Sequence, residues 1–187
     1  MFISHVDAAL EQLLRERLPL DEEYGDVSFE VPSSTWAAQL SRITVNLFLY
    51  DVQRSSQPSR AMTVRTENGA QVRRRPQPMV QLGYLVSAWA GSPRDEHQLL
   101  GDLVSLLAGL EAVPADLLSP DLSSSVQLSI GDDRASNREL WSAAGGTLKP
   151  AVAVLATVAS DTFDFEEMAP AVERISAMAN RMKGPRP

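Results

Sequence analysis

The chain has 187 residues, 44% of them hydrophobic and 22% charged, which is the size and composition of one folded domain. Its 17 basic and 24 acidic side chains give a formal net charge of −7, which argues against a general nucleic-acid-binding protein, because such proteins need a cationic face. The absence of cysteine excludes disulfides, thiolate catalysis and zinc–thiolate sites.

The N-terminal segment predicts a helix and no targeting signal. It reaches charged residues too early to contain the apolar core of a secretion signal, and no stretch of the chain approaches the run of about 18 apolar residues that a membrane span requires. We therefore expect a cytoplasmic protein. Apolar side chains at helical spacing predict a helix over residues 3–17, which Pro19 ends. Ser4 and Asp7 have the spacing of a capping pair at its start.

Two strands and a loop follow this helix. Residues 26–31 alternate between apolar and polar side chains, which is typical of a half-buried strand, and Pro32 ends it. Residues 42–53, "RITVNLFLYDVQ", carry β-branched and aromatic side chains on both faces, which favours a central strand. Residues 54–60 are polar and indicate a loop.

A hairpin and a third long strand come next. Asn68 and Gly69 lie between two alternating runs, which predicts a β-hairpin over residues 61–75. After two prolines, residues 79–90 are typical of another long strand.

The hairpin ends in the one basic run of the chain, Arg73, Arg74 and Arg75. Two interpretations stay open, because both follow from an exposed sheet edge. The arginines could bind an acidic partner surface, or they could keep an exposed hairpin arm soluble and unpaired.

The second half of the chain alternates helices and strands. The predicted elements are a long helix that starts near Ser92 and ends before Pro114, a tight helical turn within 113–122, a strand over 125–130, a short helix over 137–144, a strand over 147–160, and a tail helix from Pro170 to Met182. No linker divides the chain. We expect one α+β domain over residues 1–187, with a mixed, mostly antiparallel sheet packed by helices, a core of about 3–160 and a C-terminal helix or arm of about 161–187.

Asp95, Glu96 and His97 place two acids beside an imidazole, as an acid–base enzyme would require. The start of a helix explains the same residues. Ser92 suits the N-cap, Pro93 suits the first helical position, and Asp95 suits the third, where a carboxylate can reach back to the cap's amide. Carboxylates in a first turn also complement the helix dipole. We favour the helix-start interpretation and keep a small hydrolase using Glu96 and His97 as an alternative.

Other chemistry is sparse. No nucleophile elbow, phosphate-binding loop, dinucleotide fingerprint or zinc-protease motif occurs. Only two histidines are present, so we expect no metal site, and the acidic stretches at 21–23 and 131–134 lack the oxygen spacing of a calcium loop. We expect the three tryptophans, Trp36, Trp89 and Trp141, to be packing anchors.

Three stretches, read together, resemble one family. They are "ITVNLFLYDV", then "RRPQPMVQLGYLVSAWA" leading into "DEHQLLG", and then "LWSAAGGTLKPAVAV". Their order and spacing resemble the cap, or tail-terminator, proteins of extracellular contractile injection systems, which are phage-tail-like particles with a sheath around an inner tube. The residues that match this pattern are Tyr84, Leu85, Trp89, Glu96, His97, Leu100, Gly101 and Trp141. We expect these signature residues to be structural.

The resemblance implies a ring, expected to be a homohexamer, on the distal end of the tube and sheath. Such a protein ends polymerisation and anchors the sheath, without a cofactor, a metal, a catalytic residue, nucleic acid or membrane insertion. It is expected to assemble in the cytoplasm into particles whose release on lysis stays open. The candidate contacts with sheath and tube are the hairpin at 61–75, with Arg73, Arg74 and Arg75, and the region after Ala159. A baseplate or cargo-loading adaptor of the same particle is the alternative.

Overall fold

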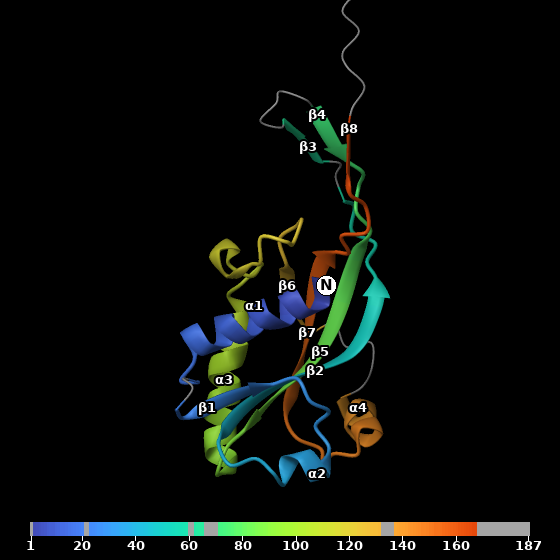
Figure 1. Ribbon diagram of the computed structural model, residues 1–187. Coiled ribbons are helices and arrows are strands. Elements are labelled where there is room, and N and C mark those ends of the chain that lie inside the picture. Colours follow the sequence, from blue (N-terminus) through green and yellow to red (C-terminus); the bar gives the residue numbers. More distant parts are fainter. Residues whose placement is uncertain (1, 21–22, 60–61, 66–70, 132–136, 168–187) are drawn as a thin grey trace, which may run out of the picture.

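The molecule consists of a body built on a five-stranded sheet and an arm built on a three-stranded sheet (Figure 1). The computed structural model describes residues 2–20, 23–59, 62–65, 71–131 and 137–167. The body strands, in spatial order, are β1 (Gly25–Ser28), β2 (Ile43–Arg54), β5 (Met79–Trp89), β7 (Ala151–Ala159) and β6 (Gln127–Ile130). The arm strands, in order, are β3 (Met62–Arg65), β4 (Gln71–Arg74) and β8 (Phe165–Glu167).

The predicted α+β class with a mixed, mostly antiparallel sheet is confirmed. Strands β1 and β2 pair in parallel, and the other strand pairs of the described residues are antiparallel. The helical elements are α1 (Phe2–Arg17), α2 (Ser34–Ala37), α3 (Pro93–Ala108), the 3₁₀ turn η1 (Ala115–Leu117) and α4 (Asn137–Ala144).

Helices cover both faces of the body sheet, because its central strands are apolar on both sides. On one face, buried leucines of α1 and α3 pack against alternate residues of β5 and β7, such as Tyr84 and Val154, and form the larger core. On the other face, Trp36 of α2 and Trp141 of α4 pack around Leu85 of β5 in a second core. Successive residues of the central strands therefore point alternately into the two cores.

The proposed capping pair of the first helix is wrong. The helix already includes Phe2, so Ser4 lies inside its first turn and not at the N-cap. Asp7 points into the core instead, where the Tyr84 hydroxyl donates a hydrogen bond of 2.7 Å to Asp7 Oδ1. Burial raises the pKa of the Asp7 carboxyl, although the hydrogen bond from Tyr84 acts in the opposite direction. Burial, together with Asp7, also raises the pKa of the Tyr84 hydroxyl.

One strand prediction needs correction, and a second holds for part of its length. The strand predicted over 26–31 ends at Ser28, and Val31 is exposed, because the chain leaves the sheet there to enter α2. The strand over 42–53 is formed as β2, an interior strand between β1 and β5, although β5 holds the middle of the sheet. Among the described residues, β2 has strand partners on both sides only over residues 44–46.

Other predicted elements agree with the structure. The hairpin strands, the long helix, the tight helical turn, the short helix over 137–144 and the strands after 125 and 147 are all present. Gly145 has a φ of +69° directly after α4, a backbone conformation that favours glycine. The elements α2 and β8 were not predicted. The Asn68-Gly69 turn and the tail helix from Pro170 to Met182 lie outside the described residues.

Within the part of the chain that the structure describes, no helix has the length and hydrophobicity needed to cross a bilayer.

The Asp7–Tyr84 pair predicts a pH-dependent term in stability. Because the pKa of Asp7 in the folded protein lies above its ordinary value of 3.8, the native state binds more protons than the unfolded state between these two pKa values. The contribution of Asp7 to stability is therefore fully present below pH 3.8 and is lost as the pH rises through the folded pKa. Relative to Asp7→Asn, the wild-type free energy of unfolding should fall over this window in denaturant titrations.

A second substitution separates the two causes of the shift. In Tyr84→Phe, the hydrogen bond that favours the ionised carboxylate is absent, so the loss of stability with rising pH should become larger. A constant difference between wild type and Asp7→Asn at all pH values would contradict the assignment.

Candidate functional site

The base of the arm is held by a buried amide. Gln77, which precedes β5, is only 6% exposed. Its Nε2 donates a hydrogen bond of 2.6 Å to the carbonyl oxygen of Phe163, and the Phe163 amide donates one of 3.0 Å to Gln77 Oε1. Arg74 Nε donates a further bond of 2.6 Å to the same carbonyl oxygen. Together these contacts join the chain that enters β5 to the chain that leaves β7.

A carboxylate completes this network. Asp161 Oδ1 lies 3.5 Å from Arg74 Nη2 and also accepts a hydrogen bond from the Ser123 hydroxyl. Asp161 has a φ of +51°, a conformation that non-glycine residues adopt rarely and that surrounding contacts must hold. The Ser160 amide donates to the Pro78 carbonyl oxygen at 2.9 Å. The direction in which the arm leaves the body is therefore fixed by side-chain and backbone hydrogen bonds.

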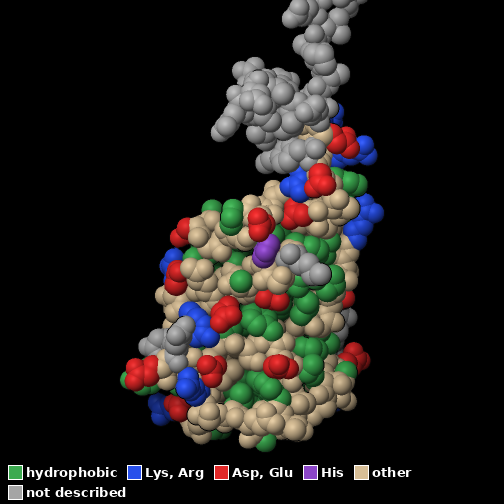
Figure 2. All heavy atoms as spheres, viewed as in Figure 1, with side chains coloured by type: hydrophobic (Ala, Val, Ile, Leu, Met, Phe, Trp, Pro, Cys, Tyr) green, Lys and Arg blue, Asp and Glu red, His purple; other side chains and the backbone are tan. Residues whose placement is uncertain are grey.

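The three consecutive arginines have different environments. The Arg74 side chain is 14% exposed and belongs to the network at the base of the arm. Arg75 is 61% exposed, forms an ion pair of 2.8 Å with Glu166 and lies 6.0 Å from the centre of the Phe163 ring. Arg73 is exposed and lies opposite Glu166 in the strand register. Basic and acidic side chains accordingly lie close together on the described part of the arm (Figure 2).

The different environments of the three arginines reduce the number of candidate contact residues for sheath and tube. Arg74 faces inward and stabilises the arm, so of the three candidates only Arg73 and Arg75 present their charges to solvent. The pairing of β4 with β8 also shows that the arm is more than a hairpin, since the segment after Ala159 contributes its third strand. The two regions expected to make contacts thus form one arm.

The Asp95–His97 triplet starts α3, as its spacing predicts. The Ser92 hydroxyl accepts a hydrogen bond of 3.2 Å from the Asp95 amide and donates one of 2.7 Å to Asp95 Oδ2. Pro93 occupies the first helical position. The Asp95 carboxylate therefore returns to the cap through the Ser92 hydroxyl, in place of the bond to the cap's backbone amide that a capping box has.

Glu96 and His97 do not form an acid–base pair. Glu96 Oε1 accepts a hydrogen bond of 3.4 Å from the Ala90 amide and forms an ion pair with Lys149 Nζ. The Glu96 and Lys149 side chains are 18% and 16% exposed. His97 is exposed, and no hydrogen bond among the described residues joins it to Glu96. Glu96 therefore attaches the first turn of α3 to the residue after β5 and to Lys149.

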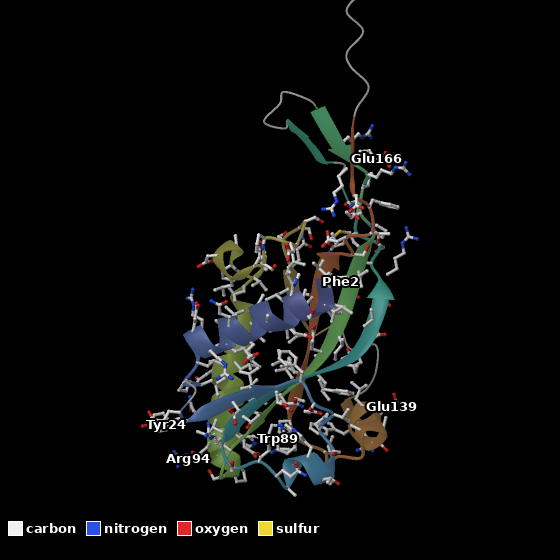
Figure 3. All side chains as sticks on the ribbon, in the orientation of Figure 1. Phe2, Tyr24, Trp89, Arg94, Glu139 and Glu166 are labelled. Atoms are coloured by element: carbon white, nitrogen blue, oxygen red, sulfur yellow. The ribbon has the colours of Figure 1, made fainter. Side chains whose placement is uncertain are left out.

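Lys149 links Glu96 to the tryptophans. Its Nζ lies 3.9 Å from the centre of the Trp89 ring, within the range of a cation–π interaction. Trp89 meets Trp36 and Trp141 edge to face, with ring centres 5.2 and 6.1 Å apart. Side chains from β5, α2, α3, α4 and the segment before β7 therefore meet at the end of the body opposite the arm (Figure 3, where Trp89 and Glu166 are labelled).

The remaining signature residues are distributed over the molecule. Tyr84 and Leu85 lie in the two separate cores, and Leu100 packs at the margin of the larger one. The structure gives no steric reason for Gly101, because a Cβ there would meet no atom within 4 Å. The signature residues are therefore spread over both cores and α3 and do not line one pocket.

Within the described ranges, no group of three or more histidine, aspartate and glutamate side chains could hold a metal ion. Most of the acidic stretches at 21–23 and 131–134 lies outside those ranges. Sequence reasoning missed two important residues, Lys149 and Gln77. A lysine next to a proline before an apolar strand was the one available signal for Lys149, and Gln77 between two prolines gave none.

Removing the cation beside Glu96 should destabilise the body. Lys149→Met keeps much of the apolar stem and leaves a largely buried carboxylate without its partner, which we expect to cost about 1–3 kcal/mol. Adding Glu96→Gln should recover part of this loss, because the amide can still accept from Ala90. Denaturant titration measures both effects. His97→Gln is the matched control and should change stability by less than about 0.5 kcal/mol.

The base of the arm can be tested separately. Gln77→Ala removes both hydrogen bonds to Phe163, so the Phe163 amide should exchange with solvent deuterium roughly tenfold faster or more, since a lost bond of about 1.4 kcal/mol corresponds to a factor of ten. Arg73→Ala on the exposed side of the arm should leave this rate unchanged. Equal exchange rates in wild type and Gln77→Ala would show that the amide does not hold the arm.

The comparisons with known proteins agree with this architecture. A family described as the Pvc16 N-terminal domain matches residues 5–174. No curated protein sequence matches the chain significantly.

Two solved structures have a similar fold. The first is the sheath/tube terminator, in the extended state, of the extracellular contractile injection system PVC, with a TM-score of 0.70, 17% identity, and coverage of 97% of this chain and 64% of that chain. The second is the anti-feeding prophage cap, described as a tube-terminating cap, with a TM-score of 0.63, 20% identity, and coverage of 93% and 60%. The chain thus spans less than two thirds of the length of either protein. Because the family match extends over well more than half of the residues, the chain belongs to the Pvc16 N-terminal domain family.

Proposed function

We propose that the protein is a cap, or terminator, of a phage-tail-like contractile injection system. In this role it ends the polymerisation of tube and sheath at the distal end and anchors the sheath. The observation that carries the proposal is the similarity in fold, over 97% and 93% of the chain, to two proteins described as terminators of such particles. Family membership over residues 5–174 supports it independently of the coordinates.

The role has a physical requirement that the architecture suits. Tube and sheath subunits add through heterologous contacts, which continue without limit unless something closes the last layer. A terminator must fit that layer on one side and present no equivalent surface on the other. The protein has two unlike ends, a charged arm and an opposite end that encloses the tryptophan cluster. It can therefore bind at one end without offering the same surface at the other.

We propose a ring of identical subunits, expected to be a homohexamer, that acts through shape and without catalysis or a cofactor. The engagement of Glu96 with Lys149 supports a structural use of the one acid–histidine motif in the chain. Assembly is proposed to occur in the cytoplasm, on the growing tube and sheath.

The arm is the proposed contact with sheath or tube. Three strands hold it, its base is fixed, and Arg73 and Arg75 present charge on its exposed side. A short, charged sheet away from the body resists unplanned pairing and favours a partner with complementary carboxylates.

Deletion of the gene tests the function. Particles from a deletion strain should have uncontrolled tube and sheath lengths by electron microscopy, and the gene supplied in trans should restore a uniform length. Particles of normal length that still contract would remove the basis for the proposal. A labelled protein found at the opposite tip would instead indicate a baseplate or cargo-loading adaptor.

Charge reversal tests the arm. In Arg73→Glu with Arg75→Glu, co-purification with sheath and tube proteins should fall at least tenfold, because two cations that are exposed on the described part of the arm change sign. Arg94→Glu is the control, since Arg94 is exposed at the other end of the body (Figure 3). Unchanged recovery of sheath and tube would exclude the arm as the contact while leaving the terminator function untouched.

A further inference from the structure

An apolar hollow lies beside α3 at the end of the body opposite the arm. Its volume is about 210 Å³, and Pro19, Ile43, Ala90 and Leu99 form its apolar lining. Asp95 and Asp102, both exposed, lie at its margin. The hollow can accept a large apolar side chain and offers carboxylates to cations beside it.

Two large apolar side chains are exposed where β1 and β2 begin, on the side of the sheet that carries the hollow. Ile43 is 39% exposed, and Tyr24, directly before its register partner Gly25, is also strongly exposed. Figure 2 shows hydrophobic side chains between acidic ones at this end of the molecule. Exposed large apolar side chains gathered around a hollow are typical of a protein interface.

The stripe of α3 beside the hollow has the spacing of a helix-binding groove. Asp95, Gln98, Leu99 and Asp102 recur at i, i+3, i+4 and i+7 and therefore lie on one face of the helix. An amphipathic helix with apolar anchors at matching intervals, flanked by basic residues, would complement this stripe.

Residues 168–187 of the chain have that chemistry. They lie outside the described residues, and their sequence places Val172, Ile175, Ala179 and Met182 at helical spacing. The same segment contains one acidic residue, Glu173, and four basic ones, Arg174, Arg181, Lys183 and Arg186. Its apolar stripe matches the hollow, and its positive charge matches the two carboxylates.

The segment cannot reach the hollow of its own chain as a helix. It starts after Glu167, which lies on the arm, beyond the Met79 end of β5, whereas the hollow lies beside Ala90 at the other end of that strand. The 11 residues of β5 alone span roughly 35 Å. A helix of about 20 residues spans about 30 Å, which is less than the path from the arm to the hollow.

We propose that residues 168–187 of one copy dock into the hollow between α3 and β2 of a neighbouring copy. In this contact, the segment that follows the arm of one subunit meets the opposite end of the next subunit. Such a contact joins two different surfaces and is therefore heterologous, which is the type of contact that closes rings. The inference rests on the proposed ring and names the surfaces that would join its subunits. It leaves the exposed side of β4 available for sheath or tube.

Disulfide trapping tests the contact directly, because the chain contains no cysteine of its own. Full-length Asp102→Cys is mixed with full-length Lys183→Cys under mild oxidation, and the products are separated by non-reducing electrophoresis and identified by mass spectrometry. The matched control replaces Asp102→Cys with Asp116→Cys, an exposed position on η1. The Asp102→Cys mixture should form the mixed disulfide at least tenfold faster than the control, because docking raises the local concentration of the two thiols.

Each outcome decides between specific readings. Equal rates in the two mixtures overturn the inference. So does a chain that carries both Asp102→Cys and Lys183→Cys and forms only an intramolecular disulfide. If the inference is overturned and the native mass still shows a ring, other surfaces must join the subunits. The proposed function would then stand. A specific mixed disulfide in a protein whose gene deletion leaves particle length unchanged would support the contact and refute the terminator role.

A charge exchange provides a second measurement that does not depend on cysteine geometry. Asp102→Lys should weaken self-association at least fivefold in sedimentation velocity, and so should Lys183→Glu. The two variants mixed together should associate more tightly than either alone, because the opposite charges are restored across the interface. Mixing that restores nothing would contradict the proposed pairing.

Discussion

The burial of β5 on both faces is the constraint on which the rest of the structure depends. A strand with water on one side needs helices on one face only, whereas β5 presents Tyr84 to one core and Leu85 to another. The two faces are covered by different means. Long amphipathic helices, α1 and α3, cover the first, and the second is covered by two short helices that contribute Trp36 and Trp141.

The second core also explains why a lysine and a glutamate lie so deep in a protein of this size. The helices α2 and α4 are too short to cover this face of the sheet with small side chains, so the large rings of Trp36 and Trp141 fill the space. Lys149 covers the outer face of Trp89 and pairs with Glu96, which holds the start of α3 against the end of β5. One ion pair thus connects a helix of the first layer with the aromatic cluster of the other, and the acid–histidine motif becomes part of the packing.

The arm follows a different rule, because it has no helical layer over its described strands. The direction of the arm is fixed by polar contacts among Arg74, Gln77, Asp161 and Phe163. The helices of the body are instead held on its sheet by hydrophobic packing. Buried polar networks of this kind specify one geometry, since a displaced partner leaves an unsatisfied group behind. A rigid, charged projection at one end and an apolar hollow at the other give the molecule a polarity that suits assembly into a larger particle.

The sequence by itself determined the periodic elements and their class. Alternation marked β7, leucines on one side marked α3, and Ser92 with Asp95 marked its first turn, because these signals are local and reflect backbone geometry. Only the tertiary structure decided which polar residues turn inward. Asp7 accepts a hydrogen bond from Tyr84 and does not cap α1. Arg74 bonds to the Phe163 carbonyl oxygen, whereas Arg73 and Arg75 are exposed. Lys149 pairs with Glu96, which lies 53 positions earlier in the sequence. Such partners are chosen by proximity in the folded chain, and no local pattern encodes a distance between residues so far apart in sequence.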